Sequence, residues 1–282
     1  MKKNLPVLFT FVFILLACTP ATSTPPPGPN LETMVAMTLE AMTAAAPTGT
    51  AITFQNVGFV IPSGLALGAT GEAVPEVTET TDAPWDVAPA HIRFTLNGYN
   101  DSLAKFSEAF IKVYPAQGDT SWAGNSLPSL QALLASPSAP LDAKSLPGVP
   151  GFNAAQMVAA QVTRINFIDG AGIRMVTQYG QAVMPITNRG TFYHFQGLTS
   201  DGKYYIVAVL PIGAPFLPNE YDTNAPTPPG GVAFPDINNT DVTVFDNYFQ
   251  AVTGVMNAAG PNTYSPTLPM LDALVQSITV TP

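Results

Sequence analysis

The sequence predicts an α+β fold in which a central antiparallel β-meander sheet is flanked by helices, as an α/β/α sandwich. Four β-prone runs between residues 162 and 210 are joined by short connections that contain glycine, which is typical of consecutive hairpins. Both faces of these runs are largely apolar or aromatic, so the sheet needs a cover on each side. Two later stretches, 241–258 and 269–277, are predicted helices that supply such a cover.

The composition indicates a globular protein that does not bind nucleic acid. Hydrophobic residues make up 46% of the 282 residues and charged residues only 10%, which gives ample apolar material for a core. The formal net charge is −9, and no stretch concentrates Lys and Arg among aromatic residues. The 29 prolines lie mostly between the apolar runs, which indicates short elements joined by stiff loops.

The first 17 residues have the layout of a secretory signal peptide. Lys2 and Lys3 precede an apolar run over 7–16, and Ala17 stands just before Cys18. The apolar run is too short for a membrane-spanning helix, which needs roughly 20 residues. We therefore expect residues 1–17 to be removed during export.

The order Leu15, Leu16, Ala17, Cys18 resembles the lipobox of bacterial lipoproteins. That resemblance implies cleavage before Cys18 and attachment of diacylglycerol and a further acyl group, such as palmitate, to this residue. Cys18 is the only cysteine of the chain, and acylation removes a thiol that would be at risk in an oxidising compartment. We expect a protein of the bacterial cell envelope, lipid-anchored to the membrane and facing the extracytoplasmic side.

The next segments predict a linker followed by one domain. Residues 19–29 contain five prolines among Thr and Ser and form a spacer, and Asn30 can cap a short helix that ends near residue 46. Residues 18–50 are thus the lipidated cysteine, the linker and the helix, and residues 51–282 are a single α+β domain. Within the domain the following elements are predicted before the meander: a strand over 52–61, a solvated acidic loop over 69–90, strands over 91–96 and 110–114, a helix over 127–135 and a proline-rich loop over 137–152.

The meander of residues 162–210 and the loop that follows it complete the predicted domain. Glycines in the connections DGAG and TSDG are expected to supply the positive φ that tight turns require, while TNRG joins the two hairpins. Residues 213–239 are too rich in Pro, Asn and Gly for regular structure. This loop is a predicted rim of a binding surface, together with the loop over 69–90.

Several blocks of the domain resemble uncharacterised bacterial lipoproteins. These blocks are PWDVAPAHIRFTLNGY (84–99), VTQYGQ (176–181) and FQGLTSDGKYY (195–205). The opening strand that runs into a Pro-Ser-Gly turn, the central meander, and the closing Leu-Asp-x-x-Val-x-Ser pattern from Leu271 resemble the PsbP/Mog1-like fold. That resemblance implies a binding or assembly module rather than an enzyme.

The sequence contains no pattern that specifies a catalytic site, a metal or a cofactor. Its two histidines, His91 and His194, lie within predicted strands, where structural roles are favoured. The residue types of a hydrolase triad are present in Ser200, His194 and Asp201. Strand alternation and the turn are expected to separate their side chains, so a shared catalytic geometry is not favoured. Zinc spacings, the dinucleotide fingerprint and the phosphate loop are all absent from the sequence.

Four polar side chains in the meander are candidate binding residues: Arg174, Gln178, Gln181 and Arg189. Arg174 and Gln178 share a strand face and can grip a carboxylate or a glycan hydroxyl, unless Arg174 instead pairs with a carboxylate such as Asp169 for structural reasons. We expect a non-catalytic binding or assembly module, tethered to the membrane, with an envelope protein or a glycan as partner. The alternatives are a cell-envelope hydrolase and a lipoprotein that binds a small solute.

Overall fold

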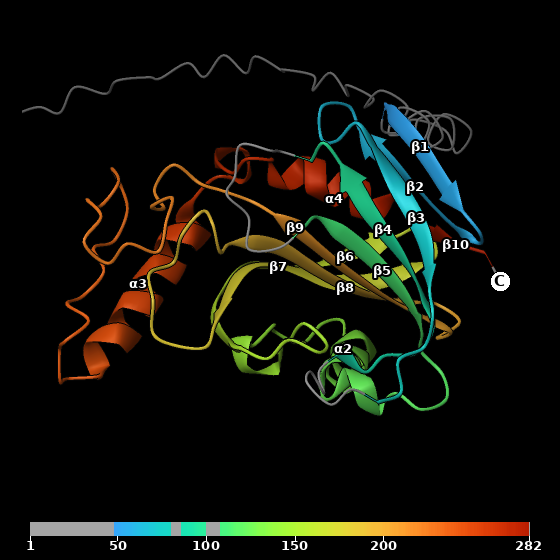
Figure 1. Cartoon of the computed structure of the whole chain (residues 1–282), viewed down its shortest axis with the longest axis horizontal. Helices are drawn as coiled ribbons and strands as arrows, with labels where there is room; N and C mark the ends of the chain where they lie inside the picture. Colours follow the sequence, from blue (N-terminus) through green and yellow to red (C-terminus); the bar gives the residue numbers. More distant parts are fainter. Residues whose placement is uncertain (1–47, 80–85, 100–107, 282) are drawn as a thin grey trace, which may run out of the picture. The chain divides into compact units, whose positions relative to one another are not determined.

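The central element of the domain is a sheet of seven strands, in which all neighbours are antiparallel. A computed structural model describes residues 48–79, 86–99 and 108–281 of the chain (Figure 1). In spatial order the strands are β3 (Gly68–Val74), β4 (His91–Asn97), β5 (Phe110–Pro115), β9 (Tyr204–Pro211), β8 (Phe192–Thr199), β7 (Gly170–Gly180) and β6 (Ala155–Phe167). The predicted α+β class with an antiparallel meander is confirmed.

Strands β6 to β9 form the predicted meander. Strands β3, β4 and β5 form a second meander, and β5 pairs with β9 to join the two. β6 begins at Ala155, earlier than predicted, and the register with β7 shifts twice along its length. β5 pairs with β9 from Phe110 opposite Val209 to Pro115 opposite Tyr204. The strands β3, β4 and β5 thereby extend the sheet beyond β9, although almost 90 residues separate the paired segments in sequence.

Helices cover both faces of the sheet, as its apolar residues on both faces require. α3 (Thr243–Ala258) and α4 (Leu268–Gln276) contribute to a large core on one face. α2 (Ser126–Ala135) packs on the other face through Leu127, Leu130 and Leu133 (Figure 1). The three helices predicted within residues 51–282 are confirmed, and each lies within two residues of its predicted bounds.

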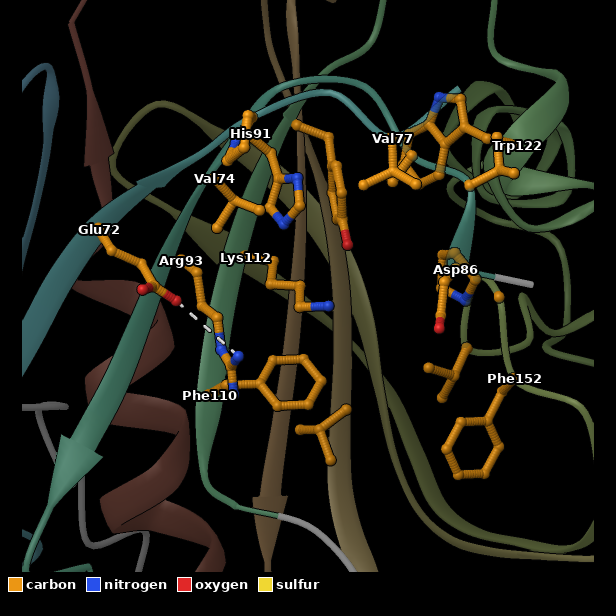
Figure 2. A pocket seen from close by; sticks show the side chains of 18 of the residues that line it. Glu72, Val74, Val77, Asp86, His91, Arg93, Phe110, Lys112, Trp122 and Phe152 are labelled. Atoms are coloured by element: carbon orange, nitrogen blue, oxygen red, sulfur yellow. Dashed lines mark ion pairs between the residues drawn. The ribbon is translucent and has the colours of Figure 1, made fainter. Parts of the chain in front are cut away.

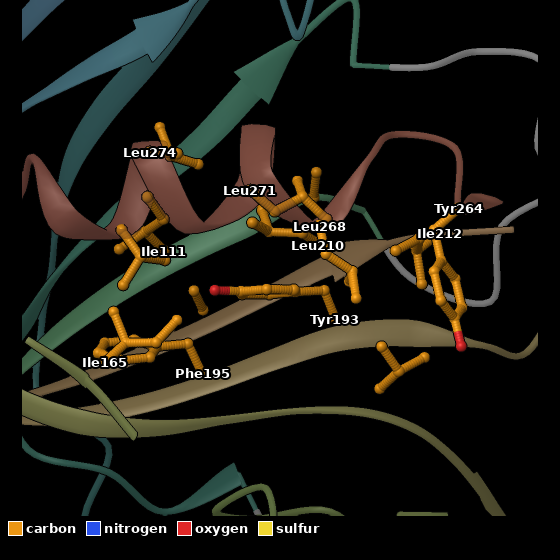
Figure 3. Packing of buried hydrophobic residues seen from close by; sticks show 14 of the residues in the cluster. Ile111, Ile165, Tyr193, Phe195, Leu210, Ile212, Tyr264, Leu268, Leu271 and Leu274 are labelled. Carbon is orange, nitrogen blue, oxygen red and sulfur yellow. The ribbon is translucent and has the colours of Figure 1, made fainter. Parts of the chain in front are cut away.

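The core under α4 is built from leucines that recur at helical spacing. Leu268 and Leu271 point toward the sheet residues Tyr193 and Leu210 (Figure 3), and all four are completely buried. Each leucine buried in this way contributes about 1.5–3 kcal/mol relative to an exposed one. This helix is therefore fixed to the sheet mainly by its apolar face.

A small second sheet corrects the prediction of one strand over 52–61. That segment forms a hairpin of β1 (Gly49–Phe54) and β2 (Val57–Pro62), and β10 (Thr279–Val280) pairs with the other edge of β2. The chain reverses at Gln55, whose φ of 52° lies in the left-handed region. The β-prone residues on either side of Gln55 and Asn56 give no hint of a turn, because such turns usually carry glycine.

The acidic segment 69–90 is also not entirely a loop. Its start belongs to β3, an edge strand that pairs with β4 from Gly68 opposite Asn97 to Val74 opposite His91. Only one side of β3 has a strand partner in the sheet, and its polar residues remain partly exposed. The sequence GATGEAV, with one acidic residue among small ones, is therefore compatible with an edge strand, where the charge also discourages pairing with other chains.

The glycines of the DGAG connection do not have the role predicted for them. The turn between β6 and β7 consists of Ile168 and Asp169, and neither Gly170 nor Gly172 has a positive φ. A Cβ atom on Gly172 would lie 2.2 Å from the carbonyl oxygen of Gln196 and 2.5 Å from the ring of Phe195. The glycine is needed for close packing, whereas Gly202 in TSDG has the predicted positive φ of 68°.

Residues 213–239 contain no helix or strand, as predicted, and the same holds for 137–152 apart from a single 3₁₀ turn at Ala143–Ser145. The remaining 3₁₀ turns are Ser121–Ala123 and Pro261–Thr263. Residues from Pro47 onward form one compact unit. The predicted signal peptide, Cys18, the linker and the helix that ends near residue 46 lie outside the described residues.

Candidate functional site

A cavity of about 490 Å³ opens on the sheet face that α2 covers, over strands β3, β4 and β5 (Figure 2). We call it the β3–β5 cavity. The loop around Val77 and Ala88, the 3₁₀ turn that carries Trp122, and the loop 149–152 complete its walls. Its lining residues with polar or aromatic side chains are Glu72, Asp86, His91, Arg93, Phe110, Lys112, Tyr114, Trp122, Phe152 and Phe192.

Three charged residues form a row across the floor of the cavity. Glu72 on β3 is opposite Arg93 on β4, and Arg93 is opposite Lys112 on β5. The Arg93 guanidinium lies 3.8 Å from the Glu72 carboxylate (Figure 2) and 3.1 Å from that of Glu108. Two cations directly opposite each other repel, and in this row only the charge of Arg93 is balanced by adjacent carboxylates.

Lys112 is the cation of the row that keeps an unmatched charge. It is partly buried, and within the described residues it forms no ion pair. Its Nζ atom lies 5.0 Å from the centroid of the Phe110 ring. Burial, and then the charge of Arg93, lower the pKa of Lys112. An anionic group at this position would relieve both effects.

Stacked rings form the wall beside Lys112. The ring centroids of His91 and Tyr114 are 4.4 Å apart, and those of Tyr114 and Trp122 are 4.3 Å apart. His91 Nδ1 donates a hydrogen bond to the carbonyl oxygen of Pro89 at 2.8 Å, which leaves Nε2 as an acceptor in the neutral ring. Burial lowers the pKa of His91, so the ring is neutral at pH 7.

The mouth of the cavity carries a carboxylate. Asp86 is exposed there, on the opposite side of the space from Lys112, whose side chain extends toward it (Figure 2). A second cavity of about 550 Å³ shares Asp86 and Phe152 with the first, and is lined further by Gln181 and Tyr221. Asp86 belongs to the predicted rim loop 69–90 and Tyr221 to the predicted rim loop 213–239. Both loops therefore line this second cavity.

Arg174, the first candidate from the sequence, is a buried part of the fold. Its Nε and Nη2 atoms donate to the two carboxylate oxygens of Asp272 on α4, at 3.2 and 3.3 Å. Tyr193 donates to the same carboxylate at 2.9 Å. Asp169, the partner considered from the sequence, instead accepts from the backbone N–H of Val280. An Arg174 held in this way is not free to bind a ligand.

Gln178 and Arg189 are held by neighbouring segments. Gln178 is completely buried, donates to the carbonyl oxygen of Pro185 at 2.9 Å and accepts from the backbone N–H of Thr187 at 2.9 Å. Arg189 forms an exposed ion pair with Glu220 at 3.0 Å. Among the four predicted binding residues, Gln181 is the one found in the lining of the second cavity, where its side chain donates to the Asn153 carbonyl oxygen at 2.8 Å.

The residues of the possible hydrolase set do not form a triad. His194 has no exposed surface, and burial lowers its pKa to about 3. Its Nε2 atom accepts from the side-chain amide of Gln196 at 3.0 Å, and Nδ1 has no hydrogen-bond partner in the described part of the chain. The carboxylate of Asp201 accepts from Thr199 at 2.7 Å, not from His194. His194 is a structural residue of the sheet, as the sequence favours.

The two cations of the β3–β5 cavity are not among the binding residues predicted from the sequence, whereas Glu72 and Asp86 lie in the segment 69–90 that is a predicted rim. Arg93 and Lys112 lie within the predicted strands 91–96 and 110–114. A cation at an inward position of a strand is a usable signal, because such positions are otherwise apolar. The convergence of the two cations depends on the pairing of β4 with β5, which the sequence does not specify.

Comparison with known protein families finds none that matches this chain, and comparison with curated proteins finds no similar sequence. The resemblances to bacterial lipoproteins and to the PsbP/Mog1-like fold therefore stay predictions. Within the described residues no group of His, Cys, Asp and Glu is placed to hold a metal ion. No helix in that part of the chain is long and apolar enough to cross a membrane.

Proposed function

We propose that this chain is a lipid-anchored binding module of the bacterial cell envelope that holds a small ligand in the β3–β5 cavity without transforming it. The observation that carries the proposal is the cavity itself. Its volume of about 490 Å³ falls in the range of small-molecule sites, roughly 300–1,000 Å³. It combines aromatic and apolar walls with a few converging charged groups, which is the usual composition of such sites.

The membrane anchor in this proposal comes from the sequence. A basic start, an apolar run and the lipobox-like order before Cys18 support export and acylation. The Pro/Thr/Ser spacer of 19–29 would hold the folded domain away from the lipid surface. The ligand is then one that is present outside the cytoplasm, and an envelope protein or glycan remains the proposed partner of the module as a whole.

The cavity favours binding over hydrolysis. Its described lining contains no Ser, Thr or Cys that would serve as a nucleophile. Its histidine, His91, uses Nδ1 to hold the Pro89 carbonyl oxygen, and no carboxylate orients the ring as in a catalytic triad. The other histidine is enclosed in the sheet.

The proposal predicts a ligand that stabilises the protein through this cavity. The full chain, purified in detergent, is heated with a panel of amino acids, organic acids, primary amines and oligosaccharides. A member of the panel that binds should raise Tm, because a ligand at about a hundredfold its Kd stabilises by about 2.7 kcal/mol. For a domain of this size that corresponds to a shift of several degrees.

Two tryptophan substitutions on one strand provide the control. Val74 lines the cavity, so Val74→Trp should fill its mouth and abolish the shift. Thr70 is exposed on the same strand and does not line the cavity, so Thr70→Trp should leave the shift unchanged. A ligand that shifts both variants equally would place binding elsewhere, and turnover of the ligand by the wild-type protein would favour the hydrolase alternative.

A further inference from the structure

The charges that line the β3–β5 cavity are balanced in number but separated in space. Arg93 and Lys112 provide two positive charges, Glu72 and Asp86 provide two negative charges, and neutral His91 adds none. Arg93 is compensated by Glu72 in the same row of the sheet, at 3.8 Å, and by Glu108 at 3.1 Å, which does not line the cavity. The charges left for a ligand are therefore one ammonium, that of Lys112, and one carboxylate, that of Asp86.

Lys112 and Asp86 face each other across the cavity without touching. Neither residue forms an ion pair in the part of the chain that the structure describes. Asp86 and Glu72 both act to raise the pKa of Lys112, against burial and the charge of Arg93. The side chain of Lys112 extends into the cavity toward the side on which Asp86 lies (Figure 2). The space between them is the part of the cavity where a ligand meets both charges.

A ligand with one kind of charge satisfies only half of this arrangement. A simple carboxylate would approach Lys112 but also meet the negative charge of Asp86, and a simple amine would meet the reverse conflict. A neutral ligand would leave the ammonium of Lys112 partly buried and without an anion. A ligand that carries both a carboxylate and an ammonium can place the carboxylate at Lys112 and the ammonium at Asp86, so that both contacts are favourable.

The walls determine the rest of the ligand. Phe110 lies beside Lys112 on one side, and the stack of Tyr114 and Trp122 lies on the other. Phe152 closes the space near Asp86 (Figure 2). Rings arranged in this way favour a flat or apolar body between them, because aromatic contacts add to the area that is buried.

We infer that the β3–β5 cavity binds a small zwitterion of the amino-acid class, with its carboxylate at Lys112, its ammonium at Asp86 and an apolar or aromatic side chain between the rings. This inference rests on the proposed function and specifies its ligand. The assignment gives each of the two unmatched charges a charge-assisted hydrogen bond, which is the strong kind in proteins.

A matched series of three probes tests the inference. L-phenylalanine carries both charges, 3-phenylpropionate lacks the ammonium, and 2-phenylethylamine lacks the carboxylate, while all three share the ring. Their Kd values for the full chain in detergent are measured by titration calorimetry. L-phenylalanine should bind roughly 10- to 100-fold more tightly than either truncated probe, because each lost contact is a hydrogen bond to a charged group.

Two charge-removing variants assign each contact to its residue. Lys112→Met should weaken L-phenylalanine to the level of 2-phenylethylamine without weakening the amine itself. Asp86→Asn should weaken L-phenylalanine to the level of 3-phenylpropionate without weakening that acid. Asp86 is exposed, so this variant is expected to fold normally, and the melting temperature of both variants is measured alongside.

The outcomes separate this inference from the proposed function. If 3-phenylpropionate binds as tightly as L-phenylalanine, or if Asp86→Asn leaves L-phenylalanine unaffected, the zwitterion assignment is wrong although the cavity still binds ligands. The same conclusion follows if none of the three probes binds but another compound is lost in Val74→Trp. If no compound binds in a manner that depends on Val74, the proposed function and the zwitterion assignment both fail.

Discussion

Single polar residues inside this domain are held by several partners each. The bidentate contact between Arg174 and Asp272 is completed by Tyr193, so the partly buried carboxylate has three donors. Breaking a fully buried pair costs about 3–5 kcal/mol, because one charge is left uncompensated, and access of water to Asp272 reduces that cost here. Such a network fastens α4 to β7 and β8, and it explains why an Arg that looks misplaced in an apolar strand need not bind a ligand.

His194 predicts an acid-sensitive fold. Burial lowers its pKa to about 3 from an ordinary value of 6.5, so between these values the unfolded chain takes up a proton that the folded protein does not. The stability linked to this residue is fully present above pH 6.5 and is lost as the pH falls toward 3. The expected loss is about 1.4 kcal/mol per pH unit.

The measurement is denaturant unfolding of wild type and His194→Leu from pH 7 to about pH 5. Leucine does not titrate, so the variant should show a flatter dependence of the unfolding free energy on pH. His91 also has a lowered pKa, but it is partly exposed and present in both proteins, so it cancels in the comparison. Parallel curves for the two proteins would mean that His194 is protonated without unfolding.

At the scale of elements, glycines in the meander leave room for aromatic side chains from neighbouring strands to pack directly against the backbone. The Phe195 ring on β8 occupies the place that a side chain of Gly172 on β7 would take. Phe195 is completely buried and belongs to the core under α3 and α4. The glycine therefore determines how closely an aromatic residue can lie against the sheet.

Two glycine-to-alanine substitutions are expected to change stability in opposite directions. Gly172→Ala inserts a methyl group against the Gln196 carbonyl oxygen and the Phe195 ring, and should cost about 1–3 kcal/mol or more. Gly254→Ala lies on an exposed turn of α3 with open space around the new Cβ, and should stabilise by roughly 0.5–1 kcal/mol. Denaturant unfolding of the two variants beside wild type measures both changes, and equal effects would show that backbone freedom, not packing, governs Gly172.

The elements also show where prediction from this sequence succeeds. The meander and the three helices were predictable because their patterns are local: short connections between strands, and apolar residues at helical spacing. The hairpin at Gln55 and the edge strand β3 were not, because a turn without glycine and a strand of mostly small residues both depend on neighbours elsewhere in the chain. The β3–β5 cavity depends in the same way on the pairing of β5 with β9, which brings segments from different parts of the sequence together.

At the scale of the whole molecule, the sequence predicts a domain attached to a membrane at one residue. Removal of residues 1–17 takes Lys2 and Lys3 with it and leaves 8 basic against 19 acidic residues, a formal charge of −11. Such a charge gives the domain no electrostatic attraction to anionic lipid. Its membrane attachment is then expected to depend on the acyl chains alone, of which two or more are needed for stable anchoring.

Acylation at Cys18 is tested by the intact mass of the protein extracted from membranes. The mass should equal a chain that begins at Cys18 plus its acyl groups. Cys18→Ser should leave the protein in the soluble fraction or as the uncleaved precursor, because serine offers no thiol for the lipid. A mature chain that begins at another residue and carries no added mass would contradict the predicted anchor.

The pairing of β10 with β2 links the order of synthesis to the order of folding. Val280 is opposite Val57, and Thr281 exchanges hydrogen bonds with Asn56. The first hairpin of the domain thus lacks one of its strand partners until residues 279–281 have been synthesised. Contacts between such distant segments slow folding, since a long loop must close before they form. The small sheet is therefore expected to be among the last parts of the domain to form.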